Sequence, residues 1–173
     1  MTRKFPMLAA VSATQRPALV LDEEQDLRLV AREELKKFFR VAAVRQGEGE
    51  MALMPECYVD TFWHSLLEDD GAYQELCLKA VGVPVDHLCI NGKGILEWVP
   101  TYHELFGGLP SIWFTDFDGK MDAAAYAEYL RASEMRASWN CTPGMNECPS
   151  PFVKASWNCT PGIKKCGSPA LLN

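Results

Sequence analysis

Residues 22–42 read DEEQDLRLVAREELKKFFRVA, and their apolar side chains recur at the spacing of an α-helix. Asp22 followed by Gln25 resembles a capping box, and the acidic residues beside them favour a helix N-terminus. The apolar positions form one stripe, which we expect to face a core. They are Leu27, Val30, Ala31, Leu35, Phe38, Phe39 and Ala42. This stretch predicts a mainly α fold.

Three more helices are expected further along the chain. One begins at Asp60, and the next runs from Asp70 to Ala80 with Gly82 as its stop. The last covers residues 122–136, where alanines give strong helix propensity. Its expected inward stripe is Tyr126, Tyr129 and Leu130. Between the helices, residues 83–119 contain three prolines and predict an irregular segment, with SIWF at 111–114 as a short strand or a buried extended piece.

The end of the chain contains a duplication. Residues 137–144 read ASWNCTPG, and residues 155–162 repeat the same eight letters. Aligned at a period of 18, the copies also share Cys148 with Cys166. The tail is rich in proline and glycine and lacks an amphipathic period, so we expect it to be disordered. The predicted domains are therefore a flexible N-terminus (1–20), a small helical domain (21–136), and two repeats (137–154 and 155–173).

This arrangement resembles the precursors of ribosomally synthesised and post-translationally modified peptides, which carry tandem core peptides behind one leader. The resemblance implies a non-enzymatic substrate protein, cytoplasmic, whose product is exported. Its implied partners are modifying enzymes that dock on the folded leader and a processing protease. Arg136 and Lys154 precede the two copies and are the expected cleavage sites.

Several modifications fit the repeats, and the sequence does not choose among them. Lanthionine-type thioethers, tryptophan cyclophanes, azoles and oxazolone-thioamide groups all remain open. The expected modification sites are Trp139, Asn140, Cys141, Thr142 and Cys148 in the first copy, and Trp157, Asn158, Cys159, Thr160 and Cys166 in the second.

Other interpretations of the tail compete with a precursor. Four tail cysteines could hold zinc or copper in a metal-handling or interaction protein, although six residues separate each pair where two to four are usual. The N-C-T triplets at 140–142 and 158–160 could be glycosylation sites in a secreted stalk. A duplicated flexible linker is the remaining alternative.

The front of the chain resembles bacterial relatives of plant glycine-rich-domain proteins. The matching residues are VDTFWH (59–64), Tyr73, Cys77, Gly82, His87, LFGGLP (105–110) and Trp113. The resemblance covers about residues 20–115 and implies a helical fold more than an activity. Family members often have a second histidine soon after the first, whereas this chain has Ser65-Leu66.

The histidines suggest a weak metal site. Asp60 and His64 share a helix face at i, i+4, and His64, His87 and Cys77 are the candidate ligands, with His103 as a further possibility. The alternative is that His64 bonds Asp60 or a backbone carbonyl. Asp116 and Asp118 do not continue into a calcium loop and predict a turn. A net charge of −6 argues against nucleic acid, and no apolar run is long enough to span a membrane.

Overall fold

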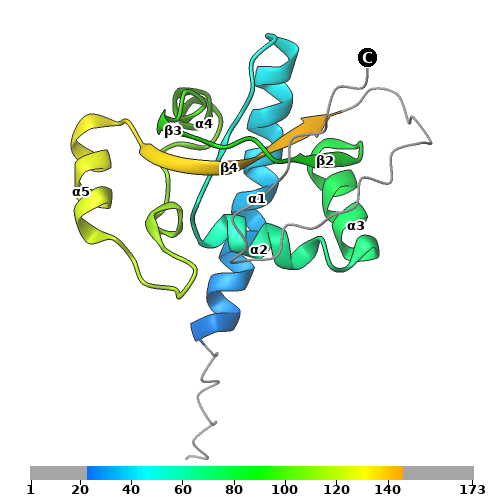
Figure 1. Ribbon diagram of the computed structural model, residues 1–173, viewed down its shortest axis with the longest axis horizontal. Helices are drawn as coiled ribbons and strands as arrows, with labels where there is room; N and C mark the ends of the chain where they lie inside the picture. Colours follow the sequence, from blue (N-terminus) through cyan, green and yellow to red (C-terminus); the bar gives the residue numbers. More distant parts are fainter. Residues whose placement is uncertain (1–22, 146–173) are drawn as a thin grey trace, which may run out of the picture.

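A computed structural model of the protein describes residues 23–145 (Figure 1). Its first helix, α1 (Glu23–Gly47), runs through the middle of the molecule. The predicted apolar stripe of this helix is largely confirmed, since Leu35, Phe38 and Phe39 are fully buried. Val30 was expected in the stripe but is 44% exposed, and the fully buried Val41 extends the buried face instead.

Four shorter helices follow α1, of which the first three pack against it, and their boundaries follow local signals. They are α2 (Tyr58–Leu66), α3 (Asp70–Val81), α4 (Val99–Phe106) and α5 (Ala123–Ala132). The start of α3 is fixed by the Asp69 carboxylate, which accepts from Ala72 N at 3.0 Å. It ends at Gly82, which adopts a left-handed conformation with φ 77°, as predicted.

The last helix is shorter than expected. Helix α5 ends at Ala132 and is capped by Ser133, which adopts a left-handed conformation with φ 56°. Tyr129 faces the core as predicted, but Leu130 is 63% exposed, so its place in the inward stripe was wrong.

A small antiparallel sheet completes the fold, which is therefore mixed α/β rather than mainly α. Its strands are β1 (Met54–Pro55), β2 (Val85–Leu88), β3 (Gly92–Ile95) and β4 (Arg136–Met145). Strand β4 pairs with each of the other three and crosses in front of α1 (Figure 1). Two of its partners come from residues 83–119, which were expected to be irregular. In the same segment, SIWF forms a 3₁₀ turn, η1 (Ser111–Phe114), rather than a strand.

Strand β4 also corrects the predicted domain boundary at residue 136. The first copy of the repeat, residues 137–144, lies inside β4 and is part of the folded domain. Residues 137–144 were expected to be disordered because an isolated segment of this composition cannot offset its ordering entropy, whereas here three partner strands pair with its backbone. The predicted flexible N-terminus, the rest of the first repeat and the whole second repeat lie outside the described residues.

The core is rich in aromatic rings. Trp98 and Trp113 pack with ring centroids 5.2 Å apart, and Phe38 meets the Trp98 ring edge-on at 5.1 Å. Inside this group lies a buried carboxylate, Glu34, which accepts from Trp113 Nε1 at 2.8 Å and from the Tyr102 hydroxyl. None of the described helices combines the length and the low polarity that crossing a bilayer requires.

Candidate metal centre

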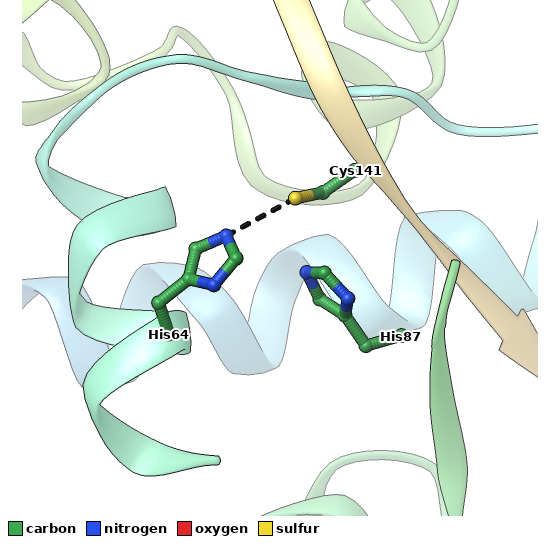
Figure 2. Close-up of side chains that lie close together, drawn as sticks. All are labelled: His64, His87 and Cys141. Atoms are coloured by element: carbon green, nitrogen blue, oxygen red, sulfur yellow. Dashed lines mark hydrogen bonds between the residues drawn. The ribbon is translucent and has the colours of Figure 1, made fainter. Parts of the chain in front are cut away.

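Three side chains from separate elements meet beneath β4. His64 comes from α2, His87 from β2 and Cys141 from β4, and they point toward one another (Figure 2). One ligand atom from each lies within 4.8 Å of the others. His64 Nε2 and Cys141 Sγ lie 3.2 Å apart.

The register of the sheet accounts for two of these positions. His87 lies opposite Pro143 in the β2–β4 ladder. Because side chains alternate along a strand, Cys141 and Pro143 share a face of β4, and Cys141 is the diagonal neighbour of His87. Both are buried, with exposed fractions of 5% for His87 and 1% for Cys141.

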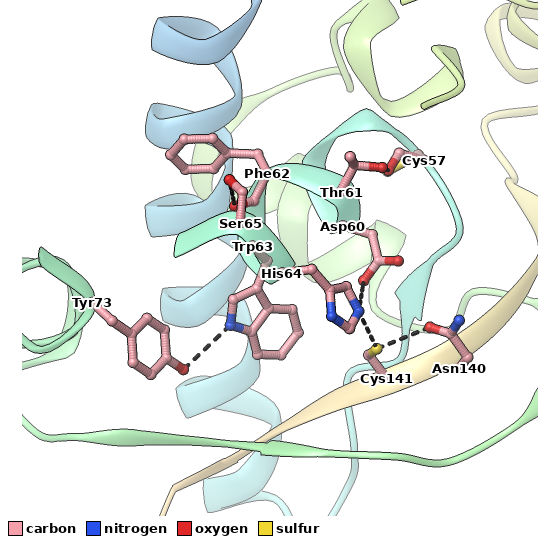
Figure 3. A network of polar contacts seen from close by, with 10 residues as sticks. All are labelled: Cys57, Asp60, Thr61, Phe62, Trp63, His64, Ser65, Tyr73, Asn140 and Cys141. Carbon is pink, nitrogen blue, oxygen red and sulfur yellow. Dashed lines mark hydrogen bonds and ion pairs between the residues drawn. The ribbon is translucent and has the colours of Figure 1, made fainter. Parts of the chain in front are cut away.

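The position of His64 depends on its neighbour in α2. Trp63 is fully buried, and its indole N–H donates to the Tyr73 hydroxyl at 3.3 Å (Figure 3). The Tyr73 hydroxyl in turn donates to Val85 O at 2.8 Å, which ties α2 and α3 to β2. Trp63 also packs edge-on against His87, with ring centroids 4.6 Å apart. This packing holds His64 beside His87, with centroids 4.8 Å apart.

Two oxygen atoms join the cluster. Asp60 Oδ1 lies 3.5 Å from His64 Nε2, and Asn140 Oδ1 lies 2.9 Å from Cys141 Sγ (Figure 3). Asp60 Oδ1 is buried and accepts no hydrogen bond from the part of the chain described here. Burying such an oxygen without a partner costs about 1–3 kcal/mol, and more when the group is charged.

The hydrogens of the cluster can serve its two oxygen acceptors, since the Cys141 thiol donates to Asn140 Oδ1 and His64 Nε2 lies 3.5 Å from Asp60 Oδ1. His64 Nε2 carries at most one hydrogen, and so does a Cys141 thiol, while the two oxygens can only accept. A cation between the imidazoles and a Cys141 thiolate satisfies these lone pairs without added hydrogens. The arrangement is therefore compatible with a metal ion as well as with hydrogen bonding.

The protonation state of His87 is also compatible with metal binding. Burial, with a smaller contribution from the nearby His64, lowers the pKa of His87 to about 4. A ring that is neutral at pH 7 keeps the lone pair that a metal requires.

The depressed pKa of His87 predicts a pH-dependent stability for the metal-free protein. The unfolded chain binds a proton near pH 6.5 while the folded chain does not until about pH 4, so stability is lost as the pH falls through this window. The loss is about 3 kcal/mol across the window. Urea unfolding in EDTA at pH 7 and pH 4.5 measures it, with His87→Gln as the control that lacks this component. A wild-type loss no larger than that of His87→Gln contradicts the expectation.

Cys77, the thiol predicted as a ligand, is not in the cluster. It lies in α3, is 1% exposed, and burial raises its pKa. Cys57 is also buried, and burial raises its pKa to about 12, so it remains a thiol. Cys141 occupies the ligand position that was predicted for Cys77, and the strand pairing of β4 brings it there. His103 lies elsewhere, with Nε2 2.8 Å from the Tyr129 hydroxyl.

The predicted calcium-like sequence does form a turn. Asp116 Oδ1 accepts from the backbone N–H groups of Asp118 and Lys120, at 3.0 and 2.9 Å. This confirms the interpretation of Asp116 and Asp118 as a turn before α5.

The expected modification sites of the first repeat have structural roles. Cys141 faces the histidines, and the Thr142 hydroxyl, 0% exposed, donates to Ala52 O at 2.5 Å. Arg136, an expected cleavage site, is the first residue of β4 and pairs with Ile95. The remaining expected sites, Cys148, Lys154, Trp157, Asn158, Cys159, Thr160 and Cys166, lie outside the described residues.

The Trp139 side chain lies over two glycines of β3. A Cβ placed on Gly92 would meet the indole at 2.6 Å, and one on Gly94 would meet it at 3.3 Å. The absence of side chains there lets the ring cover the strand.

Gly92→Ala is therefore expected to destabilise the protein by about 1–3 kcal/mol, because the new methyl group displaces the indole. Gly47→Ala is a matched control, since nothing lies within 4 Å of the added carbon. Thermal unfolding compares the two variants. Equal melting temperatures would show that Trp139 does not pack as described.

Two shallow hollows in the described part of the chain lie away from the cluster, one beside Tyr129 and Met135 and the other beside Lys93 and Ser138. No protein-family model, curated protein or solved structure matches the chain.

Proposed function

We propose that the protein binds a transition-metal ion, zinc in preference to copper, through His64, His87 and Cys141. The observation that carries the proposal is the convergence of these donors within 4.8 Å from three separate elements. Imidazole and thiolate are the ligands that zinc takes most often in proteins. The ion would join α2 and β2 to β4.

Charge and coordination favour zinc. Structural zinc sites are four-coordinate, and aspartate is among their ligands. Asp60, 3.5 Å from His64 Nε2, is the candidate for the fourth position. A Cys141 thiolate and an Asp60 carboxylate together balance the two positive charges of the ion. Neutralisation matters here because a buried unpaired charge is costly.

This proposal differs from the metal-handling hypothesis drawn from the sequence, which used the tail cysteines. A full-length variant with Cys148→Ser, Cys159→Ser and Cys166→Ser separates them. Zinc titration of the reduced protein against a chromophoric chelator should give one equivalent bound in both the wild type and the variant. Binding that disappears in the variant would assign the zinc to the tail, and absence of binding in both would refute the site.

The precursor hypothesis stays a prediction, and the duplication is the observation that favours it. Trp139 to Thr142 belong to β4. The other modification sites that the precursor hypothesis expects, and its second cleavage site at Lys154, fall in residues 146–173. A mass change in that segment after co-expression with neighbouring modifying enzymes would support it, and an unmodified segment would count against it.

A further inference from the structure

The duplicated block has the length of a strand. Strand β4 reads RASWNCTPGM over residues 136–145, and residues 154–163 read KASWNCTPGI. Eight of these ten positions are identical, and both ends are conservative, Arg to Lys and Met to Ile. The next two residues, Asn-Glu and Lys-Lys, differ in charge. The continuous match thus begins and ends where β4 does.

The identical residues include those that fix β4 in the fold. The Trp139 indole lies over Gly92 and Gly94, and the Thr142 hydroxyl donates to Ala52 O. Cys141 faces His64. The equivalents in the second copy are Trp157, Thr160 and Cys159.

The first and last residues of the block differ between the copies, but both versions are compatible with the β4 position. Arg136 is exposed at the end of the ladder opposite Ile95, where lysine serves equally. Met145 is 8% exposed and lies opposite Val85, so isoleucine keeps an apolar side chain there and favours a strand. Gln46 bonds the backbone carbonyl of Met145, which any residue supplies.

We propose that residues 154–163 are a second occupant of the β4 position within the same chain. Either copy completes the sheet, and the other is displaced. The connection allows this, because α5 ends at Ala132 and residues 133–153 would replace residues 133–135 as the link to the strand. Closing the longer loop favours the first copy by about twentyfold.

The exchange goes beyond metal binding and does not require it. It accounts for a duplication that keeps Trp, Cys and Thr at the same strand positions.

The test excludes one copy at a time from the β4 position in the full chain. Thr142 is 0% exposed, so Thr142→Arg places a charge that the position cannot accept, and Thr160→Arg does the same to the second copy. The reduced proteins are alkylated in EDTA under native conditions. Peptide mass spectrometry separates Cys141 from Cys159 because the residues that follow the copies differ.

In the wild type and in Thr160→Arg, Cys141 should react slowly. In Thr142→Arg the protection should move to Cys159, which should react at least about tenfold more slowly than in the Thr142→Arg/Thr160→Arg double variant. A Thr142→Arg protein that leaves Cys159 as reactive as in the double variant overturns the proposal. Protection of Cys159 that depends on protein concentration overturns the intrachain form. Because EDTA is present, none of these results depends on the zinc site.

Discussion

Replacing His87 with alanine is expected to lower the zinc affinity of the full-length protein by about a hundredfold or more. Structural zinc sites bind with about 10–16 kcal/mol from four ligands, so one ligand contributes roughly 3 kcal/mol. His87 is 5% exposed, so the substitution removes a ligand and leaves a buried cavity in its place. His64→Ala should have a similar effect, since His64 Nε2 lies 3.2 Å from Cys141 Sγ.

His103→Ala is the matched control for these variants. It removes the only histidine of the chain outside the cluster, whose described partner is the Tyr129 hydroxyl. Chelator competition should give this variant the wild-type zinc affinity. An equal fall in affinity for His103→Ala and His87→Ala would mean that zinc binding does not depend on the cluster.

Glu34→Ala is expected to destabilise the protein by about 4 kcal/mol, a large fraction of the stability of a domain of this size. The substitution removes the acceptor for Trp113 Nε1 and the Tyr102 hydroxyl and leaves both donors buried. Burial raises the pKa of Tyr102, and Glu34 adds to the shift, so the tyrosine is a neutral donor. Urea unfolding measures the loss.

The adjacent Glu33 supplies a matched control on the same helix. Glu33 pairs with Lys36 at 2.5 Å, as Glu34 pairs with Lys37 at 2.7 Å, but Glu33 is 63% exposed. Glu33→Ala should therefore cost less than about 1 kcal/mol. Similar losses for the two variants would show that the buried bonds of Glu34 contribute little.

The helices were predictable because their signals are local. The apolar stripe, the N-cap residue and the terminating glycine of a helix all lie within one segment of the chain. In α3 the N-cap is Asp69 and the glycine is Gly82. The sheet was missed for the opposite reason. Strand β3 consists of only Gly92–Ile95, and β1 of two residues, so neither shows a period in the sequence. Their pairing with β4 connects segments that are distant along the chain, and no local pattern records it.

Only part of the candidate site could be predicted from the sequence. Its histidines could be named from the sequence, because His64 follows a buried tryptophan and shares a helix face with Asp60. Its thiol could not be, since 77 residues separate His64 from Cys141. One signal was available in the repeat itself. A duplicated block of alternating Trp, Cys and Pro has the period of a strand, and its proline and glycine content obscured this.

The cobalt spectrum of the full-length protein tests the metal site most directly. Cobalt(II) occupies zinc sites, and a thiolate ligand gives it a charge-transfer band in the near ultraviolet. The Cys148→Ser/Cys159→Ser/Cys166→Ser variant should show this band at one equivalent, together with the intense visible bands of four-coordinate cobalt. Adding Cys141→Ser should abolish the charge-transfer band. A spectrum without the band in the first variant, or a band that survives the loss of Cys141, contradicts a site built from His64, His87 and Cys141.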